Sequence, residues 1–185
     1  MVLASRHMLD MLADSNFYSL RMTQFFNAAV NDGRAHVLTI SSAVDGLDTT
    51  APLTLLLQTP DSDKFIYMDV VATASGDALL EMFEDDGDTN HFNVSGGTTV
   101  TPRNRNRNFD DDSDVIIKKD VTVNAATDDA KLFSMRLGSK KCGGSTALTD
   151  GVLKRNTKYL IRLSTVADNN EGTLGINWYE AYSRV

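Results

Sequence analysis

Short segments in which apolar and polar residues alternate recur along most of the chain. The alternation is clearest in residues 131–137 and 158–163, and residues 173–180 place Leu174, Ile176 and Trp178 on one face. Successive side chains of a β-strand point to opposite faces of the sheet, so alternation is typical of a half-buried strand. These segments are therefore predicted to be strands.

Nine segments in all have strand character, and clusters of turn-forming residues separate them. They are residues 36–40, 53–58, 64–72, 78–84, 115–117, 121–123, 131–137, 158–163 and 173–180. The turn signal is strongest at residues 59–63, where Pro fixes φ and Asp and Ser bond to their own backbone. No helix of about 10 to 15 residues recurs between the strands, which disfavours a parallel α/β fold. The pattern predicts an all-β, antiparallel sandwich or barrel.

The beginning of the chain has a different pattern. Residues 3–13 carry apolar side chains at near-helical spacing, and residues 16–30 suit either a helix or a strand before a turn at residues 31–33. We expect an arm or short helix over residues 1–30 and one β-sandwich domain over residues 31–185. Arg6, His7 and Asp10 interrupt the apolar residues, which is unlike a secretory signal and favours synthesis and use in a cytoplasm.

Length, composition and charge narrow the class of protein. The chain has 185 residues, 42% of them hydrophobic and 23% charged, and a formal net charge of −7. This is the composition of a soluble globular domain. The negative charge disfavours general nucleic-acid binding, which needs clustered Lys and Arg. No apolar run approaches the about 18 to 20 residues that span a bilayer, so no membrane partner is expected.

Residues that could carry catalysis or bind a metal are scattered. His7, His36 and His91 lie far apart without a metal-binding spacing, and no phosphate-binding or nucleophile motif is present. Cys142, the single cysteine, is interpreted as an exposed thiol in a Gly-rich turn, and the Gly pairs at 96–97 and 143–144 as turns. We expect no enzyme, no metal and no cofactor. An enzyme with dispersed carboxylates is the weakest alternative.

Two acidic clusters, residues 85–88 and 110–114, offer the oxygen ligands that Ca²⁺ prefers. Neither has the spacing of a helix–loop–helix calcium site. Solvated loops are the preferred interpretation of both clusters.

One basic segment is the main candidate for a binding surface. In a strand, alternation would place its arginines on one face and its asparagines on the other. One hypothesis is that the arginines pair with carboxylates of a neighbouring subunit, and the other is an internal clamp to the aspartates at 110–112. The candidate interface residues are Arg103, Asn104, Arg105, Asn106 and Arg107.

Trp178 and Tyr179 could stack on a sugar. On a terminal strand beside Leu174 and Ile176, however, Trp178 is expected to belong to the core.

Four segments in this order resemble small structural proteins of tailed-bacteriophage virions, described as virion structural or as capsid decoration (cement) proteins. They are GGTTVTP at 96–102, RNRNRN at 103–108, LKRNTKYLIRL at 153–163 and NWYE at 177–180. The resemblance covers roughly residues 50 to 182.

The resemblance implies a jelly-roll-like β-sandwich on the outer face of an icosahedral shell, assembled in the host cytoplasm. Its partners would be the major capsid protein and itself, as a homotrimer at local three-fold positions. The family supplies no catalytic residues. Two other interpretations stay open: a neck, collar or tail adaptor or fibre-attachment protein, and a glycan-binding β-sandwich.

Overall fold

The structure is a computed structural model that describes residues 27–85, 92–110, 112–126, 130–138 and 144–182, except the side chains of residues 145 and 148–150. A short helix over residues 27–31 precedes the strands. The strands in chain order are β1 (Ala35–Ser41), β2 (Leu53–Gln58), β3 (Lys64–Ala74), β4 (Ala78–Asp85), β5 (Phe92–Val100), β6 (Arg103–Asn104), β7 (Ile116–Ala126), β8 (Lys131–Leu137), β9 (Gly144–Leu153), β10 (Lys158–Thr165) and β11 (Gly172–Tyr182).

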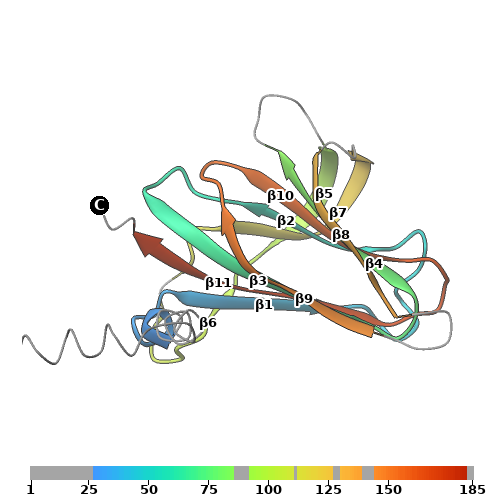
Figure 1. Ribbon diagram of the computed structural model, residues 1–185, viewed down its shortest axis with the longest axis horizontal. Helices are drawn as coiled ribbons and strands as arrows, with labels where there is room; N and C mark the ends of the chain where they lie inside the picture. The colour runs from blue at the N-terminus through green and yellow to red at the C-terminus, as the bar shows by residue number, and fades with distance from the viewer. Residues whose placement is uncertain (1–26, 86–91, 111, 127–129, 139–143, 183–185) are drawn as a thin grey trace, which may run out of the picture.

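The strands form two antiparallel sheets that pack face to face (Figure 1). The five-stranded sheet has the order β6-β1-β11-β3-β9, and the six-stranded sheet has the order β5-β7-β2-β10-β4-β8. The predicted all-β antiparallel sandwich is therefore confirmed.

The pairing pattern is that of a jelly roll. Without β5, β6 and β7, eight strands remain, and the first pairs with the last, the second with the seventh, the third with the sixth and the fourth with the fifth. Such nested pairing is what two interleaved Greek keys produce. The three additional strands lie between β4 and β8 in sequence and extend both sheets on the same side, β6 beyond β1 and β5–β7 beyond β2.

The core lies between the inward faces of the two sheets. From Ile66 to Ala74 in β3 and from Gly172 to Glu180 in β11, buried positions alternate with partly or fully exposed ones, as the sequence pattern predicted for residues 173–180. Leu174, Ile176 and Trp178 are all buried, and Trp178 is 1% exposed. The expectation that Trp178 belongs to the core is confirmed.

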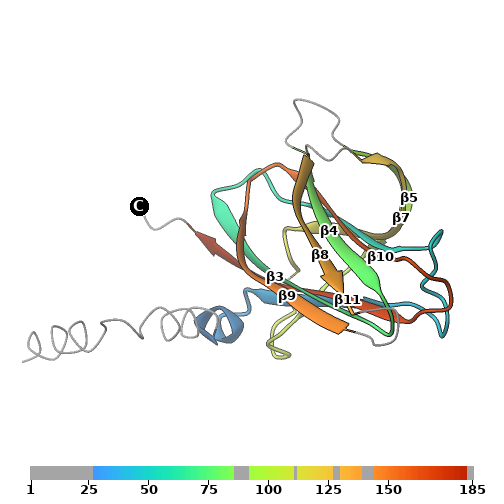
Figure 2. The ribbon, with the colours of Figure 1, turned by 45° about the vertical axis from the view of Figure 1, so that its right-hand side comes forward.

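A second apolar cluster forms on the outer face of the six-stranded sheet because the β5–β7 ribbon bends. Gly97 and Asp120 lie opposite each other in this ribbon, with φ of 87° and 56°. A Cβ at Gly97 would lie 2.5 Å from the Val121 side chain, so only glycine fits. The bend turns Val121 and Phe92 into a cluster with Leu160 of β10. Figure 2 shows the ribbon curling beside β10.

Three strand predictions were wrong or incomplete. β5 contains the Gly pair at 96–97, which was interpreted as a turn, and β9 was not predicted. Residues 115–117 and 121–123 were predicted as separate strands, but 116–126 form one strand that bends at Asp120. In β5, small residues give no visible alternation of apolar and polar positions. In β7, the bend at Asp120 exchanges the faces on which the apolar and polar residues lie, so the alternation does not continue through the strand.

Several sequence-based interpretations fall outside the described residues. They concern the helix at 3–13, residues 16–26, His7, His91 and Cys142.

Candidate protein-binding surface

The candidate segment 103–108 lies at the edge of the five-stranded sheet, and only its first two residues form a strand. Arg103 pairs with Val37 and Asn104 with His36 of β1. The backbone N–H of Arg105 then donates to the carbonyl of Ala35 at 2.8 Å. Beyond this point the chain leaves the sheet in a turn, so residues 105–108 do not continue β6.

The asparagine side chains build that turn. Asn104 Oδ1 accepts a hydrogen bond from the backbone N–H of Asn106 at 2.9 Å, and Asn106 Oδ1 accepts one from the N–H of Asn108 at 3.1 Å. These are two successive Asx turns, in which a side chain takes the place of a backbone carbonyl. A carboxamide both donates and accepts, so the same side chains can also anchor the turn to its surroundings.

Both anchoring bonds go to the segment that precedes β1. Asn104 Nδ2 donates to the Gly33 carbonyl at 2.5 Å, and Asn106 Nδ2 donates to the Asn31 carbonyl at 3.2 Å. Phe109 packs directly on Gly33, where a Cβ would lie 2.6 Å from its ring. The turn is therefore fixed on the helix and on β1. We refer to residues 103–108 as the Arg loop.

The arginines of the Arg loop face solvent while the asparagines face inward. Arg103, Arg105 and Arg107 are exposed, whereas Asn104 is 8% exposed. Arg105 Nη1 lies 3.5 Å from Asn177 Oδ1 on β11. The alternation predicted from the sequence is present in the burial of the side chains, although most of the segment is not a strand.

The internal clamp was the alternative hypothesis for these arginines. Within the part of the chain that the structure describes, Arg103 and Arg107 form no ion pair, and Asp110 and Asp112 form none either. Asp111 lies outside that part. The described residues therefore contain no clamp at Arg103 or Arg107.

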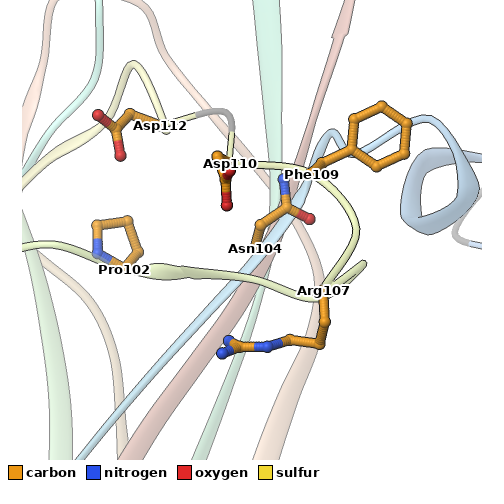
Figure 3. Close-up of a pocket in the computed structure, with 6 residues that line it drawn as sticks. All are labelled: Pro102, Asn104, Arg107, Phe109, Asp110 and Asp112. Atoms are coloured by element: carbon orange, nitrogen blue, oxygen red, sulfur yellow. The ribbon is translucent and has the colours of Figure 1, made fainter.

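A small polar pocket of about 190 Å³ lies beside the Arg loop (Figure 3). It is open to solvent and mixes one guanidinium with two carboxylates. Such a pocket suits charged side chains of a protein partner better than an apolar ligand. The lining residues are Pro102, Asn104, Arg107, Phe109, Asp110 and Asp112.

The acidic side of the pocket is held in place by a buried carboxylate. Glu180 Oε1 accepts hydrogen bonds from Ser113 Oγ at 2.7 Å and from the Asp114 N–H at 3.0 Å. Trp178 Nε1 donates to Ser113 Oγ at 3.1 Å. Lys64 forms ion pairs with Asp114 and Glu180. The segment that follows the pocket is thus bonded to the end of β11.

These charges have a consequence for the titration of Lys64. Its hydrogen bond with Asp114 raises the pKa of the ammonium above the ordinary value of 10.5; burial opposes the rise and the charge of Glu180 adds to it. Lys64 therefore stays charged near neutral pH and keeps its two partners together.

Sequence reasoning missed the residues that fix the surface. Glu180 and Ser113 are distant in sequence, and only the fold brings them together. Phe109 could have been recognised from the sequence, because a bulky apolar residue inside a polar loop often packs against another part of the protein.

Other candidate chemistry finds little support in the described residues. They contain no group of three or more His, Cys, Asp or Glu side chains that could hold a metal ion. None of their helices has the length and apolar character needed to cross a membrane. Sugar stacking on Trp178 is ruled out in the folded protein, because that ring is buried and stacks on His36 at 5.5 Å.

No protein-family model matches the chain, and no curated protein matches it.

Proposed function

We propose that the protein is a virion structural protein, specifically a capsid decoration protein that binds the outer surface of a phage head and bridges its capsid subunits. In this proposal it assembles in the host cytoplasm, acts as a homotrimer at local three-fold positions, and contributes binding without catalysis or a cofactor. The Arg loop is the part that contacts the major capsid protein.

The observation that carries the proposal is the fixed, outward-facing Arg loop. Two of its guanidiniums, those of Arg103 and Arg107, form no ion pair with the described residues, while Asn104 and Asn106 hold the backbone beneath them. A guanidinium keeps its charge and can bond a carboxylate with two parallel N–H groups. Because the loop is ordered before binding, little further entropy is lost when a partner docks.

The fold also supports this role. Jelly rolls are common among viral capsid domains, although the same fold serves lectins and enzymes, so the fold alone assigns no function. A trimer that repeats a modest contact three times gains avidity without any single tight site. The net charge of −7 favours particles that stay dispersed.

The experiment is rebinding of the purified protein to phage heads from which it has been stripped, followed by co-sedimentation. The test variant is Arg103→Glu with Arg107→Glu. The matched control is Arg155→Glu with Lys158→Glu, which makes the same charge change at exposed cations remote in sequence from the Arg loop.

We expect the test variant to bind at least about ten-fold more weakly, because like charges then face carboxylates, and the control to stay within about two-fold. Raising the salt concentration should weaken binding of the native protein to the heads, so that its affinity differs little from that of the variant. An equal loss of binding in the test and control variants would contradict the role of the Arg loop. Failure of the native protein to rebind would contradict the decoration role itself.

Cryo-electron microscopy of the particle distinguishes the virion alternatives. Density at local three-fold positions of the shell supports decoration. Density on the tail axis with five-, six- or twelve-fold symmetry would instead assign the protein to the neck, collar or tail.

A further inference from the structure

The polar pocket beside the Arg loop carries charges of both signs. Figure 3 shows the carboxylates of Asp110 and Asp112 towards the top of the view and the guanidinium of Arg107 towards the bottom. All three side chains are exposed. Within the part of the chain that the structure describes, none of them takes part in an ion pair. A partner that docks here therefore meets two carboxylates and one guanidinium that do not neutralise each other.

The backbone that carries these charges is fixed on both sides of the pocket. Arg107 lies inside the second Asx turn of the Arg loop, which the hydrogen bond from the N–H of Asn108 to Asn106 Oδ1 closes at 3.1 Å. Asp112 directly precedes Ser113, whose hydroxyl donates to the buried Glu180 at 2.7 Å. The positions from which the opposite charges extend are thus set before any partner binds, which makes their order in space a feature that a partner can recognise.

The size of the pocket indicates what can enter it. Its volume of about 190 Å³ is below the about 300–1,000 Å³ of sites that enclose a free small molecule. One side chain of a docked protein is a better match. Lys and Arg suit it, because their charged heads can bond the carboxylates while their apolar stems lie along Pro102.

The same charges exclude two simple kinds of partner surface. A surface that carries acids alone would pair with Arg103 and Arg107 but would bring like charges next to Asp110 and Asp112. A surface that carries bases alone would pair with the aspartates and be repelled by the arginines. Like charges that face each other across an interface weaken binding and disfavour the wrong partner or the wrong register.

We propose that the docking segment of the major capsid protein has mixed charge, with a Lys or Arg side chain between or beside its carboxylates. The carboxylates bond Arg103 and Arg107, and the basic side chain enters the polar pocket and bonds Asp110 or Asp112. This inference rests on the proposed function and specifies the partner surface that the same site accepts.

The test uses the rebinding assay with stripped phage heads and a variant that combines Asp110→Asn with Asp112→Asn. A second variant, Asp110→Glu with Asp112→Glu, keeps both charges. The matched control is Asp45→Asn with Glu171→Gln, which removes two exposed carboxylates at the ends of β1 and β11 that lie away from the Arg loop. Asn at position 45 tolerates the φ of 54° found there.

We expect the Asn variant to bind the heads about three- to ten-fold more weakly, because exposed ion pairs each contribute modestly. The Glu variant and the control should stay within about two-fold of the native protein. Reversing the charges with Asp110→Lys and Asp112→Lys should weaken binding further. If the Asn or Lys variant binds as tightly as the native protein, or more tightly, the inference is overturned, because the partner surface is then acidic throughout.

Failure of this inference and failure of the proposed function give different results. If the native protein does not rebind, both are wrong. If the native protein rebinds and the Asn variant equals it, the proposed function stands and only the mixed-charge partner is rejected. Urea unfolding followed by Trp178 fluorescence checks that each variant folds. Asp110→Asn and Asp112→Asn are also measured singly, and at least one of them should bind more weakly than the native protein.

Discussion

Replacing Asn104 with alanine removes the two hydrogen bonds that fix the start of the Arg loop. The Gly33 carbonyl loses its donor at 2.5 Å and the Asn106 N–H loses its acceptor at 2.9 Å. Each intramolecular hydrogen bond contributes about 0.5–1.5 kcal/mol net, so the free energy of unfolding should fall by about 1–3 kcal/mol. For a domain of this size, that corresponds to a Tm lower by roughly 2–12 °C.

Urea unfolding followed by the fluorescence of the buried Trp178 measures this change. Asn108→Ala is the matched control. Among the described residues, the exposed Asn108 side chain contacts Asn106 alone, at 3.3 Å, and the hydrogen bond of the Asn108 backbone N–H remains in the variant. The control should stay within about 0.5 kcal/mol of the native protein. Hydrogen exchange at the Asn106 amide should accelerate in Asn104→Ala alone. If Asn104→Ala lowered the free energy of unfolding no more than the control and left hydrogen exchange at the Asn106 amide unchanged, the idea that Asn104 holds the Arg loop would be refuted.

Three further outcomes follow from the structure. Trp178→Ala should lower the free energy of unfolding by about 3–5 kcal/mol in a calorimetric or urea experiment. Tyr182→Ala, at an exposed ring, should change it by under about 0.5 kcal/mol. Similar effects of the two substitutions would contradict the position of Trp178 in the core. Gly97→Ala should cost at least about 1 kcal/mol by urea unfolding, because φ is +87° and the Cβ meets a valine; a neutral result would contradict the bend. The raised pKa of Lys64 means that the folded protein holds its proton more tightly than the unfolded chain. The contribution of the contact with Asp114 is therefore complete below about pH 10 and declines at higher pH. The difference in unfolding free energy between the native protein and Lys64→Met should shrink as the pH rises above 10.5, and a constant difference up to pH 12 would contradict it.

Alternation predicted the strands that carry large apolar side chains. β3, β10 and β11 were predicted because each has large apolar residues at alternate positions along the strand, which places them together on its buried face. β5 and β9 escaped prediction because they consist largely of Gly, Ser, Thr and Ala, which give no contrast between faces. In β7 the left-handed backbone at Asp120 reverses the alternation, so one strand had the pattern of two.

The nested order of the strands was implied only by the resemblance to virion proteins. Which strand pairs with which depends on contacts between residues more than 100 positions apart, such as those of β1 with β11. A local pattern contains no information on such contacts.

The conformation of the candidate binding surface was predicted in part. The alternation of Arg and Asn predicted that the guanidiniums would lie on one face. In the structure, Arg103, Arg105 and Arg107 are all exposed to solvent, which agrees with this prediction. The sequence did not reveal that Asn104 and Asn106 would use their carboxamides to build a turn rather than continue a strand. That depends on the carbonyls of Asn31 and Gly33 lying within reach, which only the folded chain provides.

The place of β11 in its sheet limits when this protein can fold. β11 lies between β1 and β3 and is the antiparallel neighbour of both. A ribosome delivers β1 and β3 long before it delivers residues 172–182, and until then the two earlier strands have no partner between them. The five-stranded sheet must therefore close after its last strand has been translated, and a nascent chain that stalls before Gly172 exposes two strand edges to other chains.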